Sequence, residues 1–285
     1  MTRTAWVLAV GLLVLSQGCA RGAKQEQRMD GYFDNTGRED VLGGGARMIE
    51  ISTPQGKYRV WTKRVGNNPR IKLLLLHGGP GGTHEYFEAF DSHLPGAGIE
   101  YYYYDQLGSH RSDPVPDDVL PQLLSVERSV EEVEQVRQAL GLTRENFFLL
   151  GHSWGGILAM EYALKYPQHL LRMPPEQWPD PVNRAFKHLN PKVYVPMQGP
   201  SELGASGKLL NWDRTADIKN ITVPTLVIGA QHDTMDPKHM EWMAKQFPKG
   251  RFVLCPEGGH MAFYDDPEPY FKGLLAFLKD VEGKP

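Results

Sequence analysis

A serine between two glycines is the residue in this sequence best suited to covalent chemistry. The segment Gly151-His152-Ser153-Trp154-Gly155 follows an apolar run and precedes a helical pattern. In that context a G-x-S-x-G pattern is typical of a nucleophile elbow, whose small residues permit a strained turn that exposes the serine hydroxyl. The same letters can arise by chance in a chain with 30 glycines. The flanking strand and helix patterns favour the catalytic interpretation of Ser153.

A serine hydroxyl needs a base to take its proton, and the base needs an acid that orients it. His260 is the predicted base, because it lies in a loop after the last apolar strand pattern, where this chain order places the histidine. Asp233 follows the preceding strand pattern and is the predicted acid. Its rival is Asp236, but the proline that follows Asp236 indicates a helix N-cap there.

Two backbone N–H groups are expected to hold the oxyanion of the reaction. Trp154 comes directly after the nucleophile and supplies one. The glycine-rich segment His77–Gly82 follows another strand pattern, and Gly79 within it is the expected second donor. The competing interpretation is a simple turn, since Gly-Pro pairs mark turns as well. His77 and His152 lie beside these donors and are expected to shape the site.

Neither a metal nor a cofactor is expected. Four residues near the predicted acid are of metal-ligand type, but their spacing is not diagnostic, and the triad already accounts for Asp233. The two cysteines form neither a disulfide framework nor a zinc pattern. The four residues are His232, Asp233, Asp236 and His239.

The composition is that of an ordinary globular protein. The 285 residues include 31 Lys+Arg and 34 Asp+Glu, with 41% hydrophobic residues, which argues against disorder. The formal net charge of −3 gives no support for a nucleic-acid partner. The 22 prolines and 30 glycines do not recur at a fixed period, which excludes collagen, coiled coils and solenoids. The sequence leaves the oligomeric state open.

Strand and helix patterns alternate along most of the chain. This alternation predicts an α/β fold, with a mainly parallel sheet covered by helices on both faces. The expected strands are 47–52 and 57–62, which form a hairpin, then 71–76, 101–104, 147–150, 222–229 and 251–254. The expected helices are 129–140, 157–166, 237–246 and 269–281.

Segments outside this alternation define the expected domain organisation. Residues 1–18 contain Arg3 and an apolar run, which predicts a signal peptide. Residues 19–45 are polar and glycine-rich, which predicts a tether followed by an ordered start. Residues 170–212 hold many prolines and two tryptophans, and we expect them to form a reduced cap inserted into the core. The core is expected to comprise residues 46–169 and 213–285.

Cys19 offers a second type of chemistry. The apolar run before it is too short to span a bilayer. Gly18-Cys19 resembles a bacterial lipoprotein cleavage box, although Ser16 stands where leucine is usual. We therefore expect export to the periplasm and a lipid anchor on Cys19, with ordinary cleavage nearby as the alternative. Cys255 would then have no intramolecular partner and is expected to be a buried thiol.

Four motifs together resemble the proline iminopeptidase family of α/β-hydrolases, over about residues 49–281. They are His77-Gly-Gly-Pro-Gly-Gly, Asp105-Gln-Leu-Gly-Ser, Gly151-His-Ser-Trp-Gly-Gly and Gly199-Pro-Ser-Glu. The resemblance implies a serine aminopeptidase that removes an N-terminal residue, preferably proline, from small peptides with a free N-terminus. It also implies that Glu202 and Tyr194 bind the ammonium group of the substrate.

Two departures from the family pattern bear on this expectation. Thr234 stands where relatives often carry a second acid, so the ammonium site is weaker or is built otherwise. The chain between Ser153 and Asp233 is shorter than is usual in the family, so much of the helical lid is expected to be absent. Lids exclude water and limit substrate length. Two alternatives therefore stay open: a general carboxylesterase or amidase with the same triad, and an inactive homologue that has lost its cap.

Overall fold

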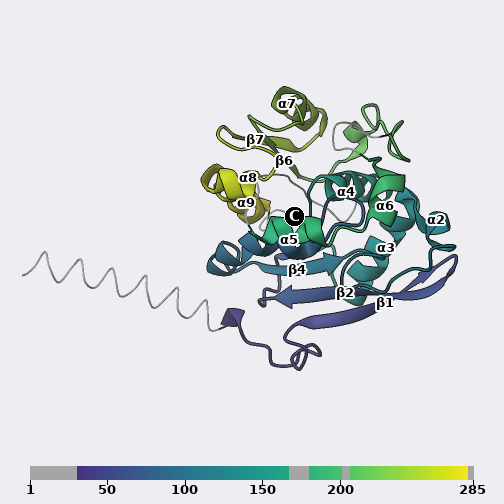
Figure 1. Cartoon of the computed structure of the whole chain (residues 1–285). Coiled ribbons are helices and arrows are strands. Elements are labelled where there is room, and N and C mark those ends of the chain that lie inside the picture. The colour runs from purple at the N-terminus through teal and green to yellow at the C-terminus, as the bar shows by residue number, and fades with distance from the viewer. Residues whose placement is uncertain (1–30, 167–179, 201–205, 282–285) are drawn as a thin grey trace, which may run out of the picture.

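The computed structural model describes residues 31–166, 180–200 and 206–281 (Figure 1). The predicted signal peptide, Cys19 and Glu202 lie outside these ranges. In the described part, no helix is both long enough and apolar enough to cross a membrane.

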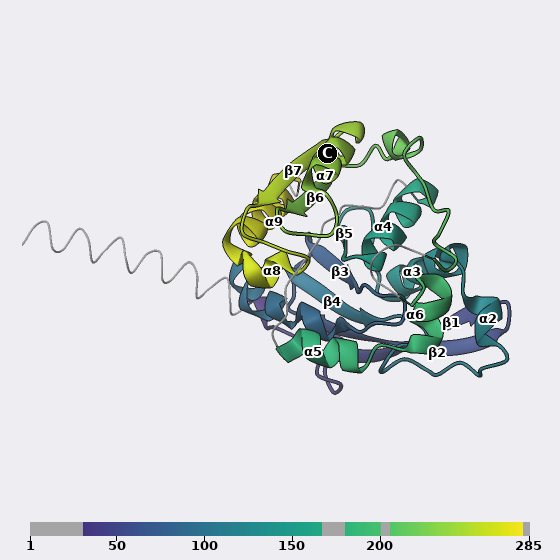
Figure 2. The ribbon, with the colours of Figure 1, turned by 45° about the horizontal axis from the view of Figure 1, so that its top comes forward.

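The strands of the described part form two separate sheets (Figure 2). The larger has the order β1-β2-β4-β3-β5, with β2 antiparallel to β1 and β4, and with β3 parallel to β4 and β5. The smaller consists of β6 and β7, which run parallel. The strands are β1 (Ala46–Thr53), β2 (Gly56–Val65), β3 (Lys72–Leu76), β4 (Glu100–Asp105), β5 (Phe147–Gly151), β6 (Thr225–Ala230) and β7 (Gly250–Cys255).

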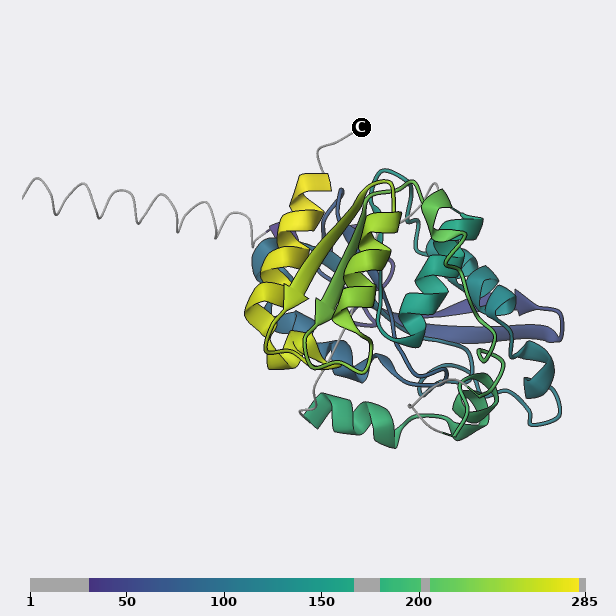
Figure 3. The same ribbon diagram turned by 90° about the horizontal axis from the view of Figure 1, so that it is seen from above.

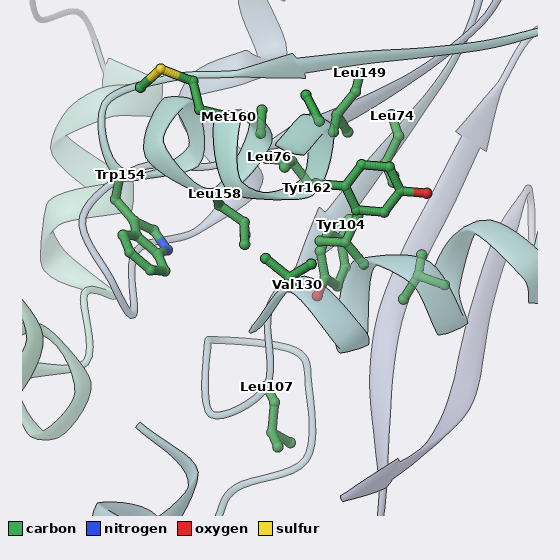
Figure 4. Close-up of a cluster of buried hydrophobic side chains, with 14 of the residues drawn as sticks. Leu74, Leu76, Tyr104, Leu107, Val130, Leu149, Trp154, Leu158, Met160 and Tyr162 are labelled. Carbon is green, nitrogen blue, oxygen red and sulfur yellow. The ribbon is translucent and has the colours of Figure 1, made fainter. Parts of the chain in front are cut away.

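Each central strand contributes side chains to two hydrophobic cores, because neighbouring side chains of a strand point to opposite faces of the sheet. Leu74 and Leu76 of β3 belong to one core, and Leu73 and Leu75 belong to the other. Figure 4 shows the first of these cores, in which Leu149 of β5 joins the β3 side chains. Burial on both faces explains why these strands read as unbroken apolar runs in the sequence.

Helices cover both faces of the sheets, as the sequence predicts. One core receives side chains from α3 (Val126–Ala139), α4 (Trp154–Lys165) and α7 (Pro237–Gln246). The other receives side chains from the 3-10 helix η1 (His84–Ser92), α8 (Ala262–Asp265) and α9 (Pro267–Val281). Figure 3 shows α7 and α9 on either side of β6 and β7. The short elements are η2 (Pro95–Ala97), α2 (Leu120–Leu123) and η3 (Ile218–Asn220).

Two residues of the segment 31–45 anchor it to the sheet, so the tether does not extend over the whole of residues 19–45. Tyr32 is only 2% exposed, and its hydroxyl donates to the carbonyl of Ile99 at 2.8 Å. Arg64 of β2 forms a buried ion pair with Asp40 at 2.6 Å. A polar composition predicted a tether here, but one aromatic ring and one ion pair are enough to fix the segment on the sheet.

Two short helices represent the insertion in the described part: α5 (Asp180–Lys187) and α6 (Pro191–Met197). Arg184 of α5 pairs with Glu85 at 3.1 Å and with Glu88 at 2.6 Å, so α5 lies against η1. The N–H group of Asn190 donates to the carbonyl of Gly81 at 2.7 Å. The insertion is therefore docked on the glycine-rich segment that follows β3.

The boundary between the two sheets falls between β5 and β6. In the described residues β5 pairs only with β3, and β6 pairs only with β7. Along the chain, α4, α5, α6 and η3 separate β5 from β6, and no strand is described among them. The residues that follow β5 and those that follow β6 and β7 must therefore meet without a shared strand pairing.

Candidate active site

Ser153 occupies a strained turn between β5 and α4. Its φ of 52° and ψ of −121° lie in a region that residues other than glycine rarely adopt. A Cβ atom on Gly151 would lie 2.0 Å from the carbonyl oxygen of Gly155, and one on Gly155 would lie 2.0 Å from that of Leu76. Both glycines are therefore required for the backbone to pass so closely, and the turn leaves the Ser153 side chain partly accessible.

Asp233 and His260 form a hydrogen-bonded pair. The Asp233 Oδ1 atom lies 2.7 Å from His260 Nδ1, and the Asp233 side chain is 1% exposed. Burial raises the pKa of Asp233 and lowers the pKa of His260 to about 4. His260 is therefore neutral at neutral pH, with Nδ1–H directed at Asp233, which leaves Nε2 as a proton acceptor. The rival acid, Asp236, instead caps α7 by accepting the N–H of Lys238 at 2.9 Å.

The loop that carries His260 reaches the elbow through His152. The Nε2 atom of His152 lies 3.4 Å from the carbonyl oxygen of His260, and the two rings are 5.4 Å apart. The Ser153 hydroxyl makes no hydrogen bond to another described residue. Hydrogen bonds between nucleophile and base are often long in ligand-free enzymes and tighten when substrate binds.

The segment His77–Gly82 lies directly beside the nucleophile. A Cβ atom on Gly78 would lie 2.7 Å from the Cβ of Ser153. Gly79 has a φ of +42°. In the described part of the chain, neither the N–H of Gly79 nor that of Trp154 donates to a protein acceptor. Two N–H groups are therefore available next to Ser153, which is the arrangement that an oxyanion requires.

Of the predicted substrate-binding residues, the structure brings Tyr194 to this site. Tyr194 lies in α6 and is 7% exposed, and its ring is 3.5 Å from the position of a Cβ on Gly79. Thr234 donates from its hydroxyl to Asp233 Oδ1 at 3.3 Å, so it adds a polar contact to the acid of the pair.

Cys255, which the sequence predicts to be a buried thiol, is fully buried.

Glu85, His110 and His188 gather metal-ligand atoms within 4.8 Å of one another. The rings of His110 and His188 are stacked with an interplanar angle of 12° and centroids 4.5 Å apart. Imidazole lone pairs lie in the ring plane, so two stacked rings do not converge on one ion. The Glu85 carboxylate also pairs with Arg184 and accepts from His188 at 2.6 Å. The cluster is better explained as an ion-pair network in which Glu85 of η1 binds Arg184 of α5 and His188, the residue after α5, on which His110 stacks.

Comparison with known proteins assigns the chain to a family. A family model described as the alpha/beta hydrolase fold matches residues 72–173. Proline iminopeptidases of Chitinophaga pinensis and Flavobacterium johnsoniae are each 42% identical to this chain, over 82% of it and 98% of their own length. A solved structure of the Mycobacterium smegmatis proline iminopeptidase has a TM-score of 0.72 at 23% identity, and it covers 83% of this chain and 98% of that protein.

The same alignments measure how much shorter this chain is. The alignment with the C. pinensis protein runs over 296 positions, whereas 82% of 285 residues is only about 234. About 60 positions of that relative therefore have no counterpart here. The F. johnsoniae alignment, over 294 positions at the same coverage, gives the same difference.

Proposed function

Because this chain belongs to the proline iminopeptidase family of α/β-hydrolases, we propose that it is a serine aminopeptidase that releases an N-terminal residue, preferably proline, from small peptides. The observation that carries the proposal is the arrangement of three residues. The Asp233–His260 pair, at 2.7 Å, contacts the strained elbow that presents Ser153. This is the set of groups that acyl transfer through a serine requires.

In the proposed mechanism, Ser153 Oγ attacks the carbonyl carbon of the N-terminal residue. The Nε2 atom of His260 takes the hydroxyl proton, and Asp233 orients the ring and stabilises the imidazolium that forms. The N–H groups of Gly79 and Trp154 hold the oxyanion. His260 then protonates the amine that leaves, and a water molecule, activated by the same base, hydrolyses the acyl-enzyme. The reaction needs no cofactor.

An exopeptidase must also bind the free ammonium group of its substrate. A carboxylate in a partly dry pocket does this well, because charge-assisted hydrogen bonds are the stronger ones. We propose Glu202 for this role, with Tyr194 beside it. The position of Tyr194 next to Gly79 supports the proposal, because an N-terminal residue bound with its carbonyl at Gly79 places its amine within a few bond lengths.

A panel of aminoacyl-naphthylamides tests this function. Prolyl-naphthylamide with a free amine should be hydrolysed, and its N-acetylated counterpart should not be. A short-chain ester, which uses Ser153 but no ammonium site, should be a poorer substrate than the free-amine compound. If the acetylated amide and the ester are cleaved as well as the free amine or better, the protein is a general esterase or amidase instead.

The shortened chain favours a second candidate, an inactive homologue. About 60 positions of the relatives are missing, and the described sheet is split between β5 and β6. We infer that the missing positions belong to the insertion before residue 213, because β1–β5, α4, β6 and β7 are all present. Reaction with a fluorophosphonate separates the candidates. An assembled triad reacts at Ser153, and the label is absent in Ser153→Ala, whereas an inactive homologue is not labelled.

We also propose that the protein is exported to the periplasm and anchored to a membrane through a lipid on Cys19. The support is the apolar run before Gly18-Cys19. In a Gram-negative host the wild type should fractionate with membranes, and Cys19→Ser should be released into the soluble periplasm. A wild-type protein found in the soluble fraction, with its N-terminus at another residue, would contradict this proposal.

A further inference from the structure

We propose that Tyr86 and Gln106 are positioning residues that hold the two oxyanion donors at a fixed separation. The inference rests on the proposed hydrolysis through Ser153, although not on the identity of the substrate. The two donors lie on different segments, with Gly79 after β3 and Trp154 after β5. The pairing of these strands ends at Leu76 and Gly151, followed by one hydrogen bond from His152 N–H to the carbonyl of Leu76 at 3.1 Å. Beyond that point side chains must fix the geometry.

Tyr86 of η1 supplies the first connection. Its hydroxyl accepts the N–H of Gly78, which precedes the donor Gly79, and lies 3.0 Å from His152 Nδ1. The Tyr86 ring is 4% exposed, so water does not compete for these contacts. One phenol therefore links the glycine-rich segment to the residue before Ser153.

The direction of each hydrogen bond in this chain is determined. An N–H can only donate, so the Tyr86 oxygen accepts from Gly78. Burial holds the pKa of His152 well below its usual range, so the ring is neutral and carries one proton. The carbonyl of His260, 3.4 Å from His152 Nε2, can only accept, which places that proton on Nε2 and leaves Nδ1 to accept the hydroxyl proton of Tyr86. Tyr86 thus connects the oxyanion segment, the elbow and the loop of the base.

Gln106, which follows β4, supplies the second connection. Its Oε1 accepts the indole N–H of Trp154 at 2.9 Å, and its Nε2 donates to the carbonyl of His77 at 3.0 Å. An indole can only donate and a carbonyl can only accept, so the amide has one possible orientation. The N–H of Gln106 also donates to His77 Nε2 at 3.0 Å. Gln106 is 6% exposed, and both ends of its side chain are satisfied.

These contacts affect catalysis more than ground-state binding. Oxyanion donors act on the charge that develops in the transition state, and losing one donor costs roughly 100- to 1,000-fold in kcat. A displacement of about 1 Å can cost on the order of 100-fold. Removing the Tyr86 hydroxyl removes its hydrogen bonds to the Gly78 N–H and to His152 Nδ1, so the two segments lose the contact that fixes them to each other.

Tyr86→Phe is the test variant, and Tyr104→Phe is its matched control. Tyr104 is equally buried, and its hydroxyl binds Glu132 on α3, on the α3/α4 side of the sheet. The rate of labelling by a fluorophosphonate should fall about 10- to 100-fold in Tyr86→Phe and less than about threefold in Tyr104→Phe. With prolyl-naphthylamide, kcat should fall by the same factor while KM stays within about threefold. Equal losses in the two variants, at equal urea midpoints, would overturn the proposal.

Two further measurements keep the test decisive. Gln106→Met breaks the second connection, and it should lower the labelling rate even if Tyr86→Phe does not fold. Hydrogen exchange of the peptide that contains residues 77–82 needs no activity. It should be faster in Tyr86→Phe than in Tyr104→Phe, and equal exchange would also overturn the proposal. A wild type that reacts with the fluorophosphonate but does not cleave the prolyl substrate would refute the proposed specificity and leave this inference standing.

Discussion

His260 Nδ1 lies 2.7 Å from Asp233 Oδ1, and both residues lie in loops that follow strands of the smaller sheet. Asp233 follows β6 and His260 follows β7, whereas Ser153 follows β5 of the larger sheet. Adjacent parallel strands therefore hold together His260 and Asp233, the proposed base and its acid. Their position relative to the nucleophile depends on side-chain packing and on the contact between His152 and the carbonyl of His260.

Asp233→Asn should reduce kcat by about 10,000-fold with little loss of stability, because an amide no longer enforces the required tautomer of His260. The measurement is kcat with prolyl-naphthylamide beside a urea titration. Asp236→Asn is the control, because Asp236 only caps α7 and asparagine is an equally good N-cap. Its activity should stay within about threefold of wild type. If the two variants lose activity equally, Asp233 is not the acid of the triad.

Gly155→Ala should disrupt the nucleophile elbow. The added Cβ would lie 2.0 Å from the carbonyl oxygen of Leu76, which is backbone and cannot move aside without shifting β3. We expect the loss of fluorophosphonate labelling and a destabilisation of at least about 2 kcal/mol. The control is Gly96→Ala, whose added Cβ would have no atom within 4 Å. This variant should lose neither fluorophosphonate labelling nor stability. Urea titrations of the two variants compare their stability. A fully active Gly155→Ala would refute the packing argument.

Stability should decrease as the pH falls from 7.5 to 5.0. Burial lowers the pKa of both His77 and His260 to about 4, whereas an unfolded histidine titrates near 6.5. Between these values the unfolded chain binds protons that the folded chain does not, so unfolding becomes easier as the pH falls. Burial likewise lowers the pKa of His93, His110 and His152, which acts in the same direction. It raises the pKa of Asp265 to about 6 and also raises that of Asp233, which acts in the opposite direction, but these are two groups against five histidines.

The urea midpoint at the two pH values checks this expectation. His77→Gln should show a smaller decrease between pH 7.5 and 5.0 than the wild type, whatever its stability at pH 7.5. The exposed His239 is the control position, and His239→Gln should keep the wild-type decrease. A wild-type midpoint that rises at pH 5.0 would contradict the prediction.

The sequence predicted the individual strands and helices well. A strand that is buried on both faces of its sheet, for example, appears in the sequence as an unbroken apolar run. The expected strand at 71–76 is found as β3, and the expected helix at 237–246 is found as α7. The connections between distant segments left no such pattern. Tyr86 lies in no motif, and its contacts to Gly78 and His152 come from the tertiary fold.

The sequence did not show where the tether ends and the ordered start begins, for a related reason. Composition averages over a segment, and a single anchor such as Tyr32 decides whether that segment packs. The split between β5 and β6 was likewise not visible in either strand pattern, because each strand is buried whether or not it has a second neighbour.

Glu202 decides between an aminopeptidase and an esterase. Glu202→Gln keeps the shape of the side chain and removes the charge that would bind the substrate's ammonium group. A charge-assisted contact contributes about 1.5–3 kcal/mol, so its loss should reduce kcat/KM for a free-amine prolyl substrate roughly 10- to 150-fold. Hydrolysis of a neutral acetyl ester should be nearly unchanged, because the ester uses the same nucleophile, base and oxyanion donors but has no ammonium group.

The control for the loss of a charge alone is Glu268→Gln, because Glu268 is an exposed acid at the start of α9. This variant should hydrolyse both substrates at the wild-type rate. If Glu202→Gln lowers both activities together, Glu202 supports the fold or the triad and does not bind the ammonium group. If it lowers neither, the ammonium site must be built from other residues, and Thr234 does not supply the charge. If Glu202→Gln lowers only the hydrolysis of the free-amine substrate, the shortened chain still recognises the N-terminal ammonium group of a peptide.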